Sequence, residues 1–426
     1  MTGITMTFNS RGRTAHALTI LGAALCSLLL APASASRAAP PETPGQTQLW
    51  TYETSAGERY FALSLTPDVQ PPAERSIDVV IVFDTSASQT GLYRVDGIEA
   101  LKTMLGSLQG DVRVQLMAGD LNAVPMSEGF TAPDSSEMVA ALEKLEQRVP
   151  LGSTDMNAVL RGAMEALPES GSRSRQIVYI GDGLSRANLL ESEEFGQLVG
   201  ALIKARITVS SYAIGPEREI ALLAALANHT GGMVYLDASE NSIAQQAGLA
   251  MAGVVLGPVV WATSVEVSPD VPESYPSPMP AMRLDRDSIV IGRLGSTEPL
   301  HLKVAAEVDD RAVNLEWTVS PEPSSDDFGY LPRLVEEARA DSGLALATIG
   351  TAGLHRVGNQ VLNAAGGLAE LATRAMKTGD VEGALRIAES VLQRDPNNPQ
   401  ALIIMQTIEK QEAQGDDESL ILGPDE

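Results

Sequence analysis

Apolar and polar positions along the middle of the chain follow a pattern typical of α/β proteins. Residues 77–83 form an apolar run interrupted only by Asp78, which predicts a buried central strand. Further apolar runs predict strands at 112–117, 176–180, 207–214 and 233–236. Amphipathic stretches predict helices at 95–108, 135–147, 155–167, 193–205, 217–228 and 241–255. Strands that alternate with helices predict a doubly wound, mostly parallel, Rossmann-like sheet over residues 75–256.

The pattern changes on both sides of this segment. Residues 49–65 predict a hairpin that turns at 55–58, and residues 259–320 offer short strands separated by Pro, Gly and Asp. All three tryptophans lie in these flanks: Trp50, Trp261 and Trp317. We therefore predict one β-sandwich module built from residues 46–74 and 257–320, with the α/β domain inserted between them.

After a linker at 321–327, residues 328–411 are predicted to be helical. Apolar and small positions within 365–398 resemble one tetratricopeptide (TPR) repeat, namely Leu368, Leu371, Ala372, Ala375, Ala384, Ala388, Val391 and Pro396. One repeat cannot bury its own face, so this hairpin either binds a second partner or packs internally as an ordinary pair of helices. The acidic tail at 412–426 is expected to be disordered.

The first 35 residues have the order of a cleavable signal peptide. Arg11 and Arg13 precede an apolar segment at 18–30, and small residues follow at 33–35. We therefore expect an exported protein, periplasmic, secreted or at the cell surface. No later stretch is long and uncharged enough to predict a transmembrane span. The sole cysteine, Cys26, lies inside the signal, so cleavage after Ala35 excludes thiol catalysis, disulfides and cysteine-bound metals.

Charge excludes some partners. The chain has 30 Lys and Arg against 55 Asp and Glu, a net charge of -25. Loss of the signal removes two arginines and no acids. Nucleic acid and anionic membranes would be repelled by such a chain, so neither is expected as a partner.

The candidate chemistry follows the first predicted strand. Asp84-Thr85-Ser86-Ala87-Ser88 would lie at the carboxyl edge of the parallel sheet, where ligands bind in open α/β folds. This segment resembles the D-x-S-x-S element of the von Willebrand factor A (VWA) family and its metal-ion-dependent adhesion site. Thr154, in the loop before a helix, and Asp182, after the fourth strand, match the other two elements of that site. The resemblance covers roughly residues 75–255.

The resemblance implies a metal site. Ser86 and Ser88 would coordinate the ion directly, Thr154 directly or through water, and Asp84 and Asp182 mostly through water. These hard oxygen donors suit Mg²⁺, or alternatively Mn²⁺ or Ca²⁺. A free coordination position would accept an acidic side chain of a protein partner. Any one of these residues alone could simply cap a loop or a helix, and the five together favour the metal site.

Gly181 and Asp120 also lie near the candidate ligands in the predicted fold. Gly181 departs from many VWA relatives, which carry threonine or serine there, but the adjacent Asp182 is in place. Asp120, near the end of the second strand, could be an auxiliary ligand but fits an exposed loop residue better.

We therefore predict a metal-dependent adhesion or scaffold protein that is not an enzyme. The alternative is an accessory subunit for assembly of, or metal insertion into, an enzyme complex. Export argues against it, because the ATP-driven partners of such subunits are cytoplasmic. A third class, a hydrolase, is unsupported, because the chain has neither an H-E-x-x-H nor a G-x-S-x-G motif.

Overall fold

The computed structural model covers most of the chain beyond the predicted signal segment. It describes residues 47–72, 74–169, 171–236, 244–268, 271–378, 380–396 and 398–408. The predicted signal at 1–35 and the predicted tail at 412–426 lie outside the described residues. Within the described ranges, no helix is both long and apolar enough to cross a membrane.

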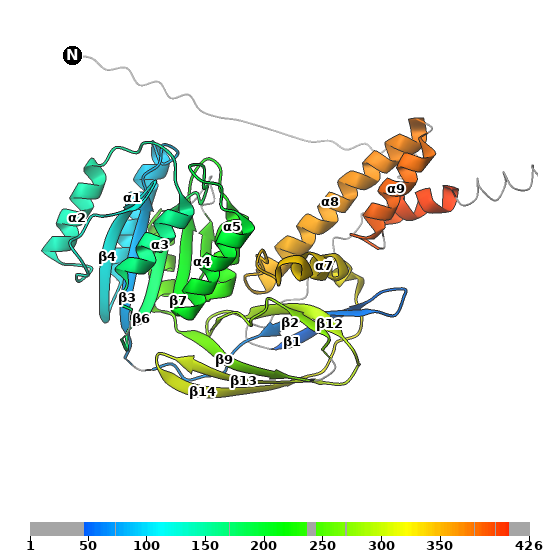
Figure 1. Cartoon of the computed structure of the whole chain (residues 1–426), viewed down its shortest axis with the longest axis horizontal. Coiled ribbons are helices and arrows are strands. Elements are labelled where there is room, and N and C mark those ends of the chain that lie inside the picture. Colours follow the sequence, from blue (N-terminus) through cyan, green and yellow to red (C-terminus); the bar gives the residue numbers. More distant parts are fainter. Residues whose placement is uncertain are drawn as a thin grey trace, which may run out of the picture. The chain divides into compact units, whose positions relative to one another are not determined.

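A six-stranded sheet in the order β5-β4-β3-β6-β7-β8 forms the centre of the α/β part (Figure 1). Its strands are β3 (Ser76–Asp84), β4 (Asp111–Gly119), β5 (Ala123–Pro125), β6 (Ser174–Gly181), β7 (Ile207–Ala213) and β8 (Val234–Leu236). All neighbours pair in parallel except β5, which is antiparallel to β4. The predicted doubly wound, mostly parallel sheet is therefore confirmed. The sequence did not predict β5, because three residues are too few to show a strand period.

Helices cover both faces of this sheet. They are α1 (Leu92–Ser107), α2 (Ser136–Gln147), α3 (Met156–Ala166), α4 (Ser192–Lys204), α5 (Ile220–Thr230) and α6 (Ala244–Leu256). Ile81 and Phe83 of β3 pack with α1, α2 and α6, whereas Val80 and Val82 pack with α3, α4 and α5. Successive side chains of a strand point to opposite faces, so a strand that is apolar throughout supplies two separate cores.

Two antiparallel four-stranded sheets, in the orders β1-β2-β12-β10 and β11-β9-β13-β14, flank the α/β part. Their strands are β1 (Gln48–Glu53), β2 (Arg59–Leu65), β9 (Val259–Val267), β10 (Glu273–Tyr275), β11 (Met282–Arg283), β12 (Ser288–Leu294), β13 (Leu300–Val308) and β14 (Arg311–Val319). β2 precedes the α/β part and β12 follows it, yet they pair, with Ala62 opposite Ile291. Phe61 shares an apolar core with Leu302 and Val304 of the second sheet. Strands from both flanks therefore share one sheet and one sandwich core.

The other face of the β1-β2-β12-β10 sheet packs on helices. These are η1 (Asp326–Phe328), α7 (Leu331–Asp341) and the start of α8 (Gly350–Thr378). Ile289 and Ile291 share a core with Leu331 and Leu354. Trp50 stacks on Phe328 with ring centroids 5.4 Å apart. This sheet is thus buried on both faces.

The C-terminal helices form a hairpin. α8 packs against α9 (Val381–Leu392), and a further helix spans 399–408. The alanines between α8 and α9 are fully buried, namely Ala365, Ala369, Ala372, Ala384 and Ala388. Leu371, which the repeat pattern placed inside, is instead exposed, and α8 begins well before residue 365. The helical hairpin is therefore present, while its TPR character stays a prediction.

Candidate metal centre

The segment from Asp84 to Ser88 turns at the carboxyl end of β3. Neighbouring loops hold the turn, because Thr85 N donates to the Gly119 carbonyl at 2.7 Å and Ala87 N donates to the Gly152 carbonyl at 3.0 Å. Asp84 is fully buried, and its Oδ1 accepts a hydrogen bond of 2.7 Å from Ser86 N. The Oγ atoms of Ser86 and Ser88 lie 2.9 Å apart. Both serine hydroxyls are thereby gathered beside the Asp84 carboxylate.

Thr154 joins this group from the loop before α3. Its Oγ1 donates to the Asp84 carboxylate and lies 3.2 Å from each carboxylate oxygen. The next residue, Asp155, caps α3 by accepting a hydrogen bond from Ala158 N at 2.9 Å. The cap fixes where α3 begins and thus holds Thr154 against β3.

Asp182 directly follows β6, the strand beside β3, and is buried. Its Oδ1 accepts a hydrogen bond from Leu184 N at 2.9 Å. Gly215, two residues after β7, lies against Asp182 with a φ of 147°, and a Cβ at that position would come within 2.8 Å of the Asp182 Cβ. Glycine is therefore the residue that permits this close approach.

Burial shapes the electrostatics of the centre. It raises the pKa of the Asp84 carboxyl; hydrogen bonds from Tyr179 and Ser86 oppose that rise, and the Asp182 carboxylate adds to it. Burial, followed by the charges of Asp84 and Asp182, raises the pKa of Tyr179 well above its ordinary value. The Tyr179 hydroxyl therefore stays protonated and acts as a hydrogen-bond donor. Two buried carboxylates at one site repel each other, and a cation between them would relieve that repulsion.

The residues brought together suit a hard cation. Three hydroxyls and two carboxylates provide the oxygen donors that magnesium prefers. Octahedral magnesium, with ligands at 2.0 to 2.1 Å, places adjacent ligands about 2.9 Å apart, which is the separation of the Ser86 and Ser88 Oγ atoms. Within the described ranges, no group of three or more His, Cys, Asp or Glu side chains is suited to a metal. The donor set is accordingly one of hydroxyls supported by paired carboxylates.

Sequence reasoning missed three residues that organise this centre. Tyr179 donates to Asp84 Oδ2 at 2.6 Å. Gln89 is buried and donates to the Ile214 carbonyl at 3.1 Å, which ties the Asp84 turn to β7. Arg148 donates to Thr85 Oγ1 at 3.2 Å and forms an ion pair with Asp120 at 2.5 Å. Of these, only Tyr179 had a signal in the sequence: a polar group on the same strand face as Gly181, two residues away.

The ion pair corrects the interpretation of Asp120. We expected an exposed loop residue, but its side chain is mostly buried and holds Arg148. Its backbone carbonyl also accepts a hydrogen bond from Asp155 N at 2.9 Å. Asp120 therefore links two loops of the centre. Sequence alone could not show this, because its partner lies 28 residues away in another loop.

Exposed apolar side chains lie on the loops that carry the candidate ligands. The four most exposed large apolar residues among those described, each 74 to 77% exposed, are Leu92, Val149, Leu151 and Leu189. We call these four residues the apolar rim. Leu151 N donates to the Thr85 carbonyl at 2.9 Å, and Ala187 N, in the loop that carries Leu189, donates to the Thr154 carbonyl at 3.1 Å. The rim thus lies on the same loops as the candidate metal ligands.

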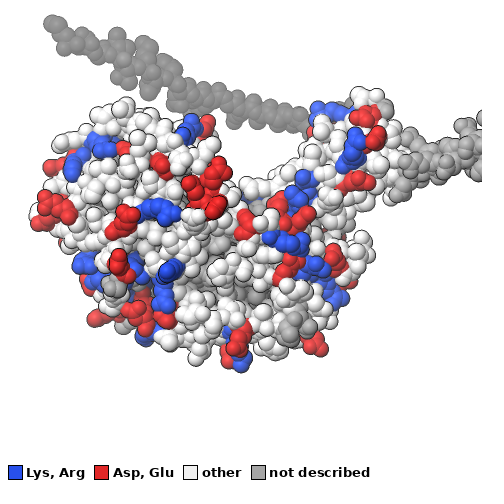
Figure 2. Space-filling model, in the orientation of Figure 1, with Lys and Arg blue, Asp and Glu red and all other residues white. Residues whose placement is uncertain are grey.

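A groove of about 400 Å³ begins beside Asp182. It is lined mainly by apolar side chains, including Leu184, Leu189, Leu190, Phe195 and Leu222. On the face of the molecule shown in Figure 2, acidic and basic side chains are interspersed. The groove that adjoins the candidate metal centre is therefore mainly apolar.

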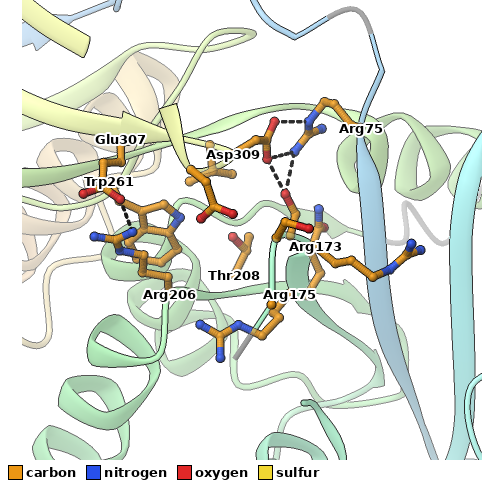
Figure 3. Close-up of a pocket in the computed structure, with 14 residues that line it drawn as sticks. Arg75, Arg173, Arg175, Arg206, Thr208, Trp261, Glu307 and Asp309 are labelled. Atoms are coloured by element: carbon orange, nitrogen blue, oxygen red, sulfur yellow. Dashed lines mark hydrogen bonds and ion pairs between the residues drawn. The ribbon is translucent and has the colours of Figure 1, made fainter. Parts of the chain in front are cut away.

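A second pocket, of about 80 Å³ and lined by polar residues, lies between the start of the central sheet and strands β9 and β13 (Figure 3). Its arginines are already engaged: Arg75 pairs with Asp309 at 2.5 Å, and Arg206 pairs with Glu307. Arg175 donates to the carbonyls of Pro168 and Glu169. The ion pairs that line this pocket join the α/β part to the sandwich, and the pocket is not the candidate site.

Residues 77–236 match the family model described as von Willebrand factor type A domain. The chain therefore contains a VWA domain, as the residues at the carboxyl edge of the sheet indicated. Inter-alpha-trypsin inhibitor heavy chain H2 of Sus scrofa is 24% identical over 193 residues, and that of Homo sapiens is 23% identical. In both cases the match covers 42% of this chain and 20% of the relative. The chain thus spans about a fifth of the length of these curated relatives.

Solved structures to which the chain is similar include a von Willebrand factor type A protein from Catenulispora acidiphila. It has 15% identity and a TM-score of 0.45, with 81% of this chain and 86% of that chain covered. The ArnB paralog VWA2 from Sulfolobus acidocaldarius has 13% identity and a TM-score of 0.43, with 85% and 97% covered.

Proposed function

We propose that this chain is an exported protein that captures a protein partner through a divalent metal, Mg²⁺ or alternatively Mn²⁺ or Ca²⁺. The metal would be held by Asp84, Ser86, Ser88, Thr154 and Asp182. The observation that carries the proposal is the convergence of these five side chains at one sheet edge, on loops that also carry the exposed apolar rim. Large exposed apolar patches with polar groups among them are typical of protein interaction sites.

Each group has a separate task in this proposal. Ser86 and Ser88 present neutral oxygens, so they bind without neutralising the ion. Asp84 and Asp182 balance its charge from positions fixed by backbone N–H donors. A bound dication then supplies an electrophilic position for a carboxylate of the partner. The apolar rim would contact aliphatic or aromatic side chains beside that carboxylate.

The C-terminal helices support a second contact. Leu371 and Val381 are exposed on the helical hairpin, and Leu402 and Ile403 are exposed on the helix that follows it. Exposed apolar side chains on a repeat-like hairpin suit a further protein partner. We therefore include residues 365–398 as a second binding surface within the proposal.

Enzyme activity is not part of the proposal. His229 is buried, and its Nε2 lies 3.2 Å and 3.0 Å from the carbonyls of Gly343 and Leu344. Burial also lowers the pKa of this imidazole. His229 is thus a structural link between α5 and the loop after α7, and it is not free to act as a general base. The alternative, an accessory subunit for complex assembly or metal insertion, would use the same metal centre and differs in being cytoplasmic.

The test is a pull-down from envelope extracts with wild-type protein and Ser88→Ala, each with magnesium and with EDTA. We expect a partner that is retained by wild type in magnesium and is lost in EDTA and from Ser88→Ala. Retention by Ser88→Ala in EDTA would show that the partner binds elsewhere. Recovery of the uncleaved chain with cytoplasmic ATPases would favour the accessory-subunit alternative instead.

A further inference from the structure

Tyr179 bridges the two acidic elements of the candidate metal centre. It lies on β6, is fully buried, and donates its hydroxyl proton to Asp84 Oδ2 at 2.6 Å. The Tyr179 hydroxyl oxygen also accepts a hydrogen bond of 3.1 Å from Gly183 N, in the turn that begins at Asp182. A phenol oxygen can donate one hydrogen bond and accept others. The hydroxyl therefore connects the end of β3 to the turn after β6.

The phenol occupies space that a side chain at position 181 would need. Tyr179 and Gly181 are two residues apart on one strand, so their side-chain positions share a face. A Cβ at Gly181 would lie 2.6 Å from the Tyr179 hydroxyl oxygen and 2.4 Å from the Asp84 Cβ. Both distances are well below van der Waals contact. The glycine at 181 is therefore what lets the Tyr179 hydroxyl reach Asp84.

The two hydrogen bonds to Asp84 define its orientation. Ser86 N donates to Oδ1 and Tyr179 donates to Oδ2, so each carboxylate oxygen has its own fixed donor. Thr154 Oγ1 lies equally far, 3.2 Å, from both oxygens and does not distinguish them. Without Tyr179, Oδ2 would lose its shortest hydrogen bond and keep the longer contact with Thr154 Oγ1. The carboxylate could then rotate about its Cβ–Cγ bond.

We propose that Tyr179 is a positioning residue of the metal centre, whose hydroxyl locks the Asp84 carboxylate and ties it to the Asp182 turn through the space left by Gly181. The inference rests on the proposed function, because it concerns the same site. A buried tyrosine with a merely satisfied hydroxyl would contribute to folding alone. A positioning residue must also change metal affinity, since partners that orient a ligand commonly contribute ten- to hundredfold.

The experiment titrates the full-length protein with Mn²⁺ by calorimetry, comparing wild type with Tyr179→Phe. The variant removes one oxygen and keeps the ring. We therefore expect a circular dichroism spectrum like that of wild type and an affinity for Mn²⁺ that is at least tenfold weaker. Tyr330→Phe is the matched control, because its buried hydroxyl has no hydrogen-bond partner among the described residues. Tyr330→Phe should bind Mn²⁺ as wild type does.

Thermal melting separates positioning from folding. A purely structural tyrosine would lower the melting temperature in EDTA and leave the Mn²⁺ dissociation constant within twofold of wild type, which would overturn the inference. Gly181→Ala supplies a second test that keeps the phenol but forces it or Asp84 to move, and it should also bind at least tenfold more weakly. If Tyr179→Phe does not fold, a wild-type Mn²⁺ affinity of Gly181→Ala would by itself overturn the inference. If wild type binds no Mn²⁺, both the proposed function and this inference are wrong. If wild type and both variants bind Mn²⁺ equally tightly, only the inference is wrong.

Discussion

The hydroxyl of Thr154 lies 3.2 Å from both carboxylate oxygens of Asp84, although 70 residues separate them along the chain. The contact exists because a loop from one side of the sheet is held against the end of β3 by the Leu151 to Thr85 and Ala87 to Gly152 hydrogen bonds. This contact places Thr154 beside Asp84 in the candidate metal centre.

Asp182→Ala should weaken metal binding without unfolding the protein. The carboxylate is buried beside Asp84, so its loss removes charge that would balance the ion, and the expected cost is about ten- to hundredfold in affinity. Ser88→Ala removes a hydroxyl 2.9 Å from Ser86 Oγ and should act similarly. Calorimetric titration with Mn²⁺ measures both. Near wild-type circular dichroism and melting in EDTA are expected, and equal binding by all three proteins would mean that the metal centre lies elsewhere.

Leu151→Ser and Leu189→Ser should reduce partner capture while leaving Mn²⁺ affinity unchanged. Both side chains are exposed, so their loss should change the free energy of unfolding by no more than about 0.5 kcal/mol. They lie on loops that carry candidate ligands but do not supply ligand oxygens. The measurement pairs Mn²⁺ calorimetry with the envelope pull-down. Leu249→Ser, at an exposed position on α6, is the control and should capture as wild type does.

Asp309→Asn should destabilise the protein by about 2 kcal/mol at neutral pH. Burial would raise the pKa of Asp309, but hydrogen bonds from Arg75 and Ser174 more than offset this and hold the pKa below its ordinary value. A depressed pKa stabilises the fold fully above the unfolded value of about 3.9. That contribution disappears as the pH falls through the folded value.

Urea unfolding of wild type and Asp309→Asn between pH 7 and pH 3 measures this dependence. The difference between the two proteins should be largest at neutral pH and should shrink below pH of about 4. The asparagine is compatible with the backbone, because residue 309 has a φ of 44° and asparagine tolerates the left-handed region. A difference that stays constant with pH would show that the Arg75 ion pair does not matter.

A fragment of residues 76–255 should fold alone and lack tryptophan fluorescence, because Trp50, Trp261 and Trp317 all lie outside it. It should be less stable than the full chain. Arg283 of β11 is buried and donates to the carbonyls of Gly231 and Val254, and the fragment loses those hydrogen bonds. Circular dichroism and thermal melting check both expectations. A fragment without secondary structure would show that the flanks are needed for folding of the central sheet.

Protein recovered from the envelope should begin near residue 36, because the basic, apolar and small-residue regions of the first 35 residues occur in signal order. N-terminal sequencing reads the start directly. A start at Met1 in that fraction would contradict export by cleavage.

The sequence by itself determined the central sheet and the edge at which the candidate ligands meet. Apolar runs and amphipathic stretches report local periodicity, and parallel strands place all their carboxyl ends on one side. Asp84 ends β3 and Asp182 follows β6, the adjacent strand, and the resemblance to the VWA family had placed both residues at that edge. The predicted helix and strand bounds of the central domain differ from the observed ones by only a few residues. They differ because caps such as Asp155, and not the hydrophobic period, set where an element begins or ends.

Only the tertiary structure decided which side chains hold those residues in place. The partners of Tyr179, Arg148 and Asp309 lie 95, 28 and 234 residues away, and no periodicity records contacts at such separations. The pairing of β2 with β12, across more than two hundred residues, is likewise a result of apolar faces meeting in space. The apolar rim shows the same limit, because an exposed leucine and a buried one are identical in sequence, and only the packing around Leu151 and Leu189 distinguishes them.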